Sequence, residues 1–130
     1  MLHLSSAVFA SPVIHAFCTR DAIYHHLFLA VTCLSIASHS LSPDMPLARV
    51  IYTVDRGTAH IAFAVVTYDL IVYALLLRTY ALVAVPLLVA YLWVYIRMMV
   101  QGTTRRRAHI VLHVAGCLAT HVAISLRAHA

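Results

Sequence analysis

Lysine and glutamate are absent from this 130-residue chain, glycine occurs three times, and charged residues make up only 10% of it. A soluble domain needs about 25% charged residues to cover its surface with polar groups, so this composition excludes a water-soluble globular protein. Hydrophobic residues make up 63% of the chain, and the mean hydropathy is +0.91. The length has room for one domain, and the composition predicts that this domain lies in a membrane.

Other scarcities exclude further classes of function. Three cysteines without a C-x-x-C pair cannot build a disulfide framework. Three glycines are too few for a phosphate-binding loop or a dinucleotide-binding glycine motif, and no G-x-S-x-G motif is present. The net charge of +5 is small for a nucleic-acid-binding protein, which would gather its arginines on one soluble face. The function is therefore either intramembrane chemistry or a role in a larger membrane assembly.

The apolar residues form four segments after a mildly apolar N-terminal stretch. A bilayer core of ~30 Å needs about 20 helical residues, and we predict spans at about residues 22–39, 58–77, 81–97 and 108–126. The predicted fold class is an all-α, polytopic transmembrane helical bundle, with residues 22–130 as its membrane domain. Residues 1–21 are expected to form an interfacial or targeting-like segment, as an interfacial or partly buried helix.

The arginines indicate the orientation of the bundle. Three arginines belong to one side of the predicted bundle, namely Arg20, Arg78 and Arg127, and six belong to the other, namely Arg49, Arg56, Arg97, Arg105, Arg106 and Arg107. The positive-inside rule places the side with six in the cytoplasm or the mitochondrial matrix, and both chain termini opposite. The run at 105–107 is also expected to contact an anionic phospholipid such as cardiolipin.

Histidine is abundant, with ten residues, and a polar constellation is predicted at one depth of the membrane. His39 ends the first predicted span, Asp55 precedes the second, and His109 and His113 open the last one. Histidines four residues apart share a helix face, and three imidazoles with a carboxylate suit a zinc ion and its activated water. With Ser35, this pattern resembles the alkaline ceramidase and adiponectin-receptor-like membrane hydrolases, although those proteins have more spans. The resemblance implies a zinc-dependent intramembrane hydrolase.

A second resemblance covers about residues 41–99. Residues 55–63 (DRGTAHIAF) resemble the H-R-x-[ST]-G signature that opens the first span in the large membrane anchor, or cytochrome b subunit, of succinate dehydrogenase. Residues 90–99 (AYLWVYIRMM) resemble the A-Y-H-x-x-x-G-I-R-H-M-M segment of that family, and residues 41–43 (LSP) its R-P-x-S-P-H element. The order of the three elements is that of the family.

This second resemblance implies an anchor subunit of respiratory complex II. Such a subunit docks the flavin and iron–sulfur subunits, pairs with a second anchor subunit and helps to form the ubiquinone site. The resemblance favours the mitochondrial inner membrane, with the bacterial plasma membrane as the alternative. The histidine that ligates haem b in the family is replaced here by Leu92 or Tyr91, so haem b is not expected in its usual place.

A ubiquinone headgroup needs a hydrogen-bond donor and a positive charge, because its carbonyl oxygens become anionic as electrons arrive. Arg56 supplies both, since a guanidinium stays protonated, and Tyr52 and Thr58 are expected to donate hydroxyl hydrogen bonds. Asp69 lies near the middle of the second predicted span, so it must be neutral, paired or facing another protein. Three functions stay open at this point: the anchor subunit, the zinc hydrolase, and a structural accessory subunit without a cofactor.

Overall fold

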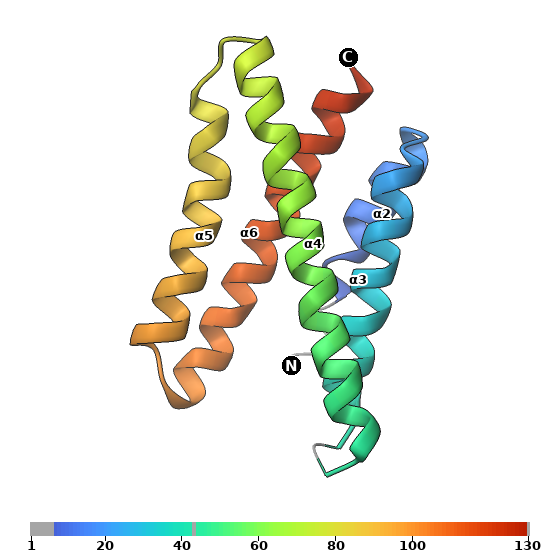
Figure 1. Cartoon of the computed structure of the whole chain (residues 1–130), viewed down its shortest axis with the longest axis vertical. Helices are drawn as coiled ribbons and strands as arrows, with labels where there is room; N and C mark the ends of the chain where they lie inside the picture. Colours follow the sequence, from blue (N-terminus) through green and yellow to red (C-terminus); the bar gives the residue numbers. More distant parts are fainter. Residues whose placement is uncertain (1–6, 43, 130) are drawn as a thin grey trace.

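The computed structural model describes residues 7–42 and 44–129, and only the backbone of residues 102, 103 and 105–107. Within this part the chain is helical and contains no strand. The helices are α2 (Ala10–Cys18), α3 (Ala22–Ser40), α4 (Pro46–Leu76), α5 (Ala81–Met99) and α6 (Gly102–Ala128) (Figure 1). The four from α3 to α6 are long and apolar enough to cross a membrane, which confirms the predicted all-α, four-span membrane fold.

Helix α4 lies at the centre of the arrangement and packs against α3, α5 and α6. The connections from α3 to α4 and from α5 to α6 lie at one end of the bundle, and the C-terminus lies at the opposite end (Figure 1). We call these the loop end and the C-terminal end. The short helix α2 packs against both α3 and α6. The largest fully buried side chains include Tyr24 of α3, Leu70 of α4 and Ile124 of α6, which belong to one apolar core.

A tight turn joins α2 to α3 at the C-terminal end. Arg20 adopts the left-handed conformation with φ of 59°, and the N–H of Asp21 donates to the carbonyl of Ala16 at 2.8 Å. These are features of the Schellman C-cap, which satisfies the last carbonyls of a helix. The same turn makes Asp21 the N-cap of α3, where its carboxylate accepts a hydrogen bond from the backbone N–H of Tyr24 at 3.1 Å.

Two elements differ in extent from the sequence-based expectation. Helix α4 begins at Pro46, whereas the span was predicted from about Thr58. Proline is favourable in the first turn of a helix, and the least helix-favouring residue in the turns that follow is Gly57, which costs only about 1 kcal/mol. The 31 residues of α4 extend for about 46 Å, so the helix is longer than the ~30 Å bilayer core. Arg49, Asp55 and Arg56 lie in its first turns, so the length beyond the bilayer core is expected at the loop end.

The N-terminal segment is only partly described, because residues 1–6 lie outside the described part of the chain. The prediction that the N-terminus lies on the C-terminal side also falls on these residues. Helix α2 itself is short, and Pro12 and Ala16 are buried in its contacts with the bundle. Phe9, just before α2, lies against Phe28 of α3 and His113 of α6. This segment therefore packs against the transmembrane helices.

A candidate functional site at the C-terminal end

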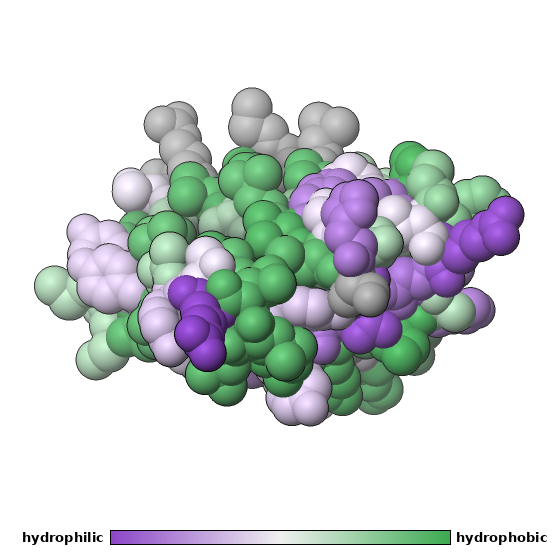
Figure 2. Space-filling view, turned by 90° about the horizontal axis from the view of Figure 1, so that it is seen from above, coloured by the Kyte–Doolittle hydropathy of each residue, from purple (hydrophilic) through white to green (hydrophobic). Residues whose placement is uncertain are grey.

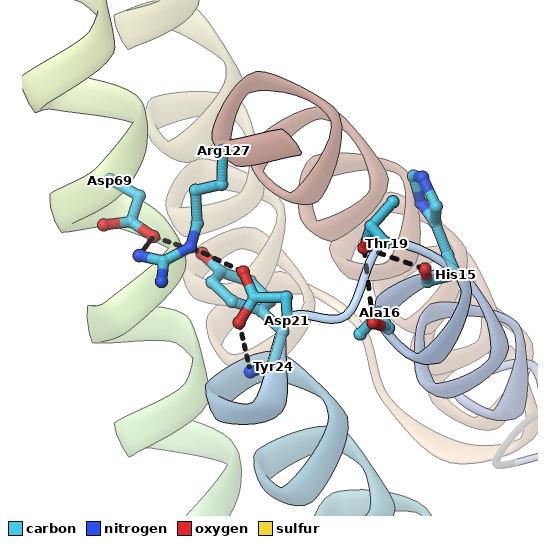
Figure 3. Close-up of polar contacts among 7 residues, drawn as sticks. All are labelled: His15, Ala16, Thr19, Asp21, Tyr24, Asp69 and Arg127. Carbon is cyan, nitrogen blue, oxygen red and sulfur yellow. Dashed lines mark hydrogen bonds and ion pairs between the residues drawn. The ribbon is translucent and has the colours of Figure 1, made fainter. Parts of the chain in front are cut away.

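Polar side chains gather at the C-terminal end of the bundle. Seen from this end, hydrophilic residues lie mainly on the side of α2, α3 and α6 (Figure 2). Below this surface, four side chains form a connected group that we call the Arg127 cluster. It comprises Asp21, Tyr24, Asp69 and Arg127 (Figure 3).

Asp69 of α4 is the more deeply buried of the two ion-paired carboxylates and has an exposed fraction of 7%. Its Oδ2 accepts a hydrogen bond from the Tyr24 hydroxyl at 2.9 Å and another from Arg127 Nη1 at 3.1 Å. An ionised carboxylate in an apolar interior needs such partners, because its desolvation costs several kcal/mol. Of the three outcomes expected for Asp69, the structure therefore shows pairing within the chain.

Arg127 joins three helices. Its Nε lies 2.6 Å from Asp21 Oδ2 at the start of α3, while its Nη1 reaches Asp69 on α4. The guanidinium carbon also lies 5.4 Å from the centroid of the fully buried Tyr24 ring, which is a cation–π contact. Hydrogen bonds between ionised groups are about twice as strong as neutral ones. The cluster therefore holds the ends of α3 and α6 against α4.

The charges of the cluster are two carboxylates and one guanidinium. Asp21 is the N-cap of α3, and the partial positive charge at a helix N-terminus stabilises a carboxylate there. One guanidinium and one helix N-terminus thus face the two carboxylates. This balance of charge favours a structural role for the cluster.

Sequence reasoning identified Asp69 but missed its partners. It treated Arg127 only as part of the charge on one side of the membrane, and it did not single out Asp21 or Tyr24. One signal was present in the sequence: an aspartate inside one apolar segment needs a partner, and an arginine directly follows the end of another.

The residues proposed to contact a quinone lie on α4, toward the loop end. The Arg56 guanidinium carbon lies 5.5 Å from the centroid of the Tyr52 ring, and the exposed fraction of Tyr52 is 50%. The Thr58 hydroxyl donates to the carbonyl of Val54 at 2.9 Å. Thr58 follows Arg56 by two residues, which is about 200° around the helix. The structure thus brings Tyr52 and Arg56 together and places Thr58 on another side of α4.

Three histidines of the predicted zinc site come close to one another. The ring centroids of His39 and His109 are 6.3 Å apart, and those of His109 and His113 are 4.4 Å apart. His113 is buried, with an exposed fraction of 8%. Among the described residues, however, no group of three or more His, Cys, Asp or Glu side chains is arranged to hold a metal ion.

The carboxylate expected at the same site, that of Asp55, accepts a hydrogen bond from a serine. Ser38 Oγ donates to Asp55 Oδ2 at 2.8 Å, whereas the sequence pattern pointed to Ser35, which is buried within α3. Ser38 is one helical turn nearer to the loop end than Ser35, which is the end where α4 begins. The side chains of Arg105, Arg106 and Arg107, expected to contact cardiolipin, lie outside the described part of the chain.

Comparison with known proteins adds no relative. No protein-family model matches the chain, and neither a curated protein nor a solved structure matches it.

Proposed function

We propose that this chain is a non-catalytic membrane subunit of a larger complex, most specifically an anchor subunit of a succinate:ubiquinone oxidoreductase. The observation that supports this is the Tyr52–Arg56 pair on α4. Arg56 carries a permanent positive charge, its guanidinium stacks on the ring of Tyr52, and Tyr52 is half exposed. A charged and aromatic pair that faces outward at the end of a span is suited to a partner outside the chain.

The chemistry of a quinone site matches this pair. Each carbonyl oxygen of the headgroup gains negative charge on reduction, and a guanidinium with a nearby phenol hydroxyl stabilises such an oxygen at the edge of an apolar region. In this proposal the pair forms one wall of the site, and the iron–sulfur subunit supplies the opposite wall. Thr58 contributes less than the sequence suggested, because its hydroxyl is bonded to Val54 on another side of the helix.

The length of α4 supports docking at the same end. The helix is longer than a bilayer core is thick, and its first residues, from Pro46, lie at the loop end. The positive-inside rule assigns this end to the cytoplasm or matrix, where the proposed soluble subunits would bind. Because the loops are short, a projecting helix offers the main surface for them at this end.

Purification in mild detergent tests the proposal through the identity of the co-purifying chains and through quinone reduction. We expect a flavoprotein and an iron–sulfur protein to co-purify, and Arg56→Ala to lower succinate–ubiquinone activity about tenfold or more. Electron transfer from succinate to an artificial dye should be unchanged. Arg78→Ala is the control, since it removes the same charge from an exposed position just after α4 at the opposite end and should leave activity within about twofold. A solitary 14.4 kDa species would refute the proposal.

The gathering of His39, His109 and His113 favours a second candidate, the zinc-dependent hydrolase. To hold a metal, the three rings would have to turn toward one point. The same purified protein discriminates the two candidates. Stoichiometric zinc that is lost in His109→Ala would support the hydrolase and overturn the anchor proposal. If neither zinc nor a flavoprotein is found but other membrane chains co-purify, the structural accessory subunit is favoured.

A further inference from the structure

Helix α2 is bonded to α6 through two histidines. His15 of α2 and His121 of α6 approach with their Nδ1 atoms 2.8 Å apart. The ring planes differ by only 26°, and the ring centroids are 5.0 Å apart. With this geometry the two Nδ1 atoms lie between the centroids, so the rings meet edge to edge. Two lone pairs cannot face each other at this distance, and one Nδ1 must therefore carry a proton.

The neighbouring serine indicates which ring donates. Ser11 Oγ donates to the carbonyl of Val8 at 3.0 Å and also lies 3.0 Å from His121 Nε2. A hydroxyl has one proton, so Ser11 makes both contacts at once only when the N–H between Ser11 and His121 is on His121 Nε2. A neutral His121 then has its lone pair on Nδ1, and His15 donates the hydrogen bond between the rings.

The number of protons on the two rings decides whether the hydrogen bond between His15 and His121 forms. A neutral His15 can donate to His121, and a charged His15 donates more strongly. A further proton on His121 Nδ1 removes the acceptor and places two positive charges against each other. The hydrogen bond therefore forms while one proton lies between the two Nδ1 atoms. It is lost when both rings carry a proton on each nitrogen and are both positively charged.

The surrounding groups do not offset this second charge. Toward the C-terminal end, the elements packed against α2 and α6 carry these titratable and charged groups: Cys18 and Arg20 at the end of α2, Asp21, Tyr24 and His25 of α3, Asp69 of α4, and Cys117 and Arg127 of α6. Helix α5 lies on the other side of α6 (Figure 1). Both carboxylates are bonded to Arg127. His25 Nδ1 lies 3.3 Å from the carbonyl of Val13. In the described part of the chain, no carboxylate bonds to either ring of the pair.

We propose that His15 and His121 form a proton-controlled clasp that holds α2 on the bundle, and that acidification on the C-terminal side releases α2. The proposal does not depend on the function proposed above. The proposal concerns only the packing of α2 against α6, which protonation of the two histidines would weaken.

Release of α2 would uncover a native cysteine. Cys117 lies one turn before His121 on the same face of α6, and its exposed fraction is 3%. The N-terminal segment covers this face on both sides of it. Phe9 contacts His113 and approaches the position of a Cβ on Gly116 at 3.9 Å, while His15 bonds to His121. The reactivity of Cys117 thus reports whether α2 is in place.

The experiment measures the reaction rate of Cys117 with dithiodipyridine in the full chain carrying Cys18→Ser and Cys33→Ser. A reference protein with Cys33→Ser and Cys117→Ala retains only Cys18, which is exposed. Dividing the rate for Cys117 by the rate for Cys18 gives a ratio from which the general dependence of thiol reactivity on pH is removed. From about pH 7.5 to about pH 4.5, a range that covers imidazole protonation, we expect this ratio to rise about tenfold.

His15→Gln provides the decisive variant, because its amide donates an N–H to neutral His121 or, turned over, accepts from protonated His121 with its oxygen, and it cannot carry a positive charge. Its ratio should not depend on pH. His26→Gln is the matched control, since His26 is exposed on α3 and bonds to the carbonyl of Ala22 in its own helix; it should keep the rise. A ratio without pH dependence in the parent protein, or an equal rise in His15→Gln, would overturn the proposal.

Discussion

Single residues decide how this bundle accommodates charge in an apolar interior. Asp69 is almost fully buried, while the side chain of Arg127 retains an exposed fraction of 31%. The arginine can therefore remain partly hydrated, whereas the aspartate depends on its two partners. Removal of one partner from a buried ion pair costs more than the pair contributes, because it leaves a charge without compensation.

The Arg127 cluster yields the first prediction. Arg127→Gln should lower the free energy of unfolding by about 2 kcal/mol or more, somewhat below the cost for a fully buried pair because Arg127 is partly exposed. Asp69→Asn should cost less in the Arg127→Gln background than in the parent, since the uncompensated charge is already present there. Arg78→Gln, an exposed arginine at the same end, is the control and should change stability little. The measurement is reversible denaturation in mixed micelles, and additive costs of the two substitutions would contradict the prediction.

For single residues, the sequence predicted that a partner is needed but not which residue it is. It showed that Asp69 needs a partner, because a carboxylate in an apolar helix is costly. It could not show that Arg127, 58 positions along the chain, and Tyr24, 45 positions away, are those partners. That pairing depends on how α3, α4 and α6 pack.

Helix ends determine the geometry at the scale of elements. Helix α4 ends with Arg78 in the left-handed conformation, with φ of 53°. The N–H of Thr79 donates to the carbonyl of Ala74 at 3.0 Å, as at the end of α2. An L-residue with a Cβ costs roughly 1 kcal/mol in this conformation, whereas glycine does not.

Substitution of this cap gives a prediction with a clear sign. Arg78→Gly should stabilise the protein by about 1 kcal/mol, because glycine is the preferred residue at this position. Arg49→Gly, inside α4, should instead destabilise by about 1 kcal/mol. Arg78→Ala removes the same charge but retains the Cβ, so it should not reproduce the gain. Unfolding midpoints of the three variants check this, and a stabilising Arg78→Ala would show that charge, and not backbone conformation, is responsible.

The extent of the elements was predictable where apolar residues define it. The expected third span, at about residues 81–97, corresponds to α5, and the first, at about residues 22–39, corresponds to α3. The beginning of α4 was missed because residues 46–57 contain three charged side chains, and hydropathy detects the part of a helix that lies in lipid. A helix that continues into water has no such signal.

At the scale of the whole molecule, the positions of the arginines predict how the bundle is oriented in the membrane. The connections at the loop end are flanked by Arg49, Arg97 and the run at 105–107, whereas Arg78 and Arg127 lie toward the other end. The structure places both of these connections at the same end, as an even number of crossings between them requires. Which end faces the cytoplasm or matrix stays a prediction from the positive-inside rule.

Labelling of single cysteines in sealed vesicles tests this orientation. In a chain whose native cysteines are replaced, Ser42→Cys lies in the α3–α4 connection and Thr79→Cys in the α4–α5 connection, and both positions are exposed. A membrane-impermeant thiol reagent should label Thr79→Cys from the outer side and Ser42→Cys only after the vesicles are opened. Labelling of both from one side would contradict the four-span arrangement, and a reversed pattern would contradict the assigned orientation.

The sequence by itself determined that this is an α-helical membrane protein with four spans, because composition and the length of apolar runs decide whether a helix is stable in lipid. Only the tertiary structure decided which polar groups meet. Arg127 with its two aspartates, and His15 with His121, come from segments far apart in the chain. Hydrogen bonds and ion pairs are short-ranged, so their partners follow from helix packing and from the turn at Arg20.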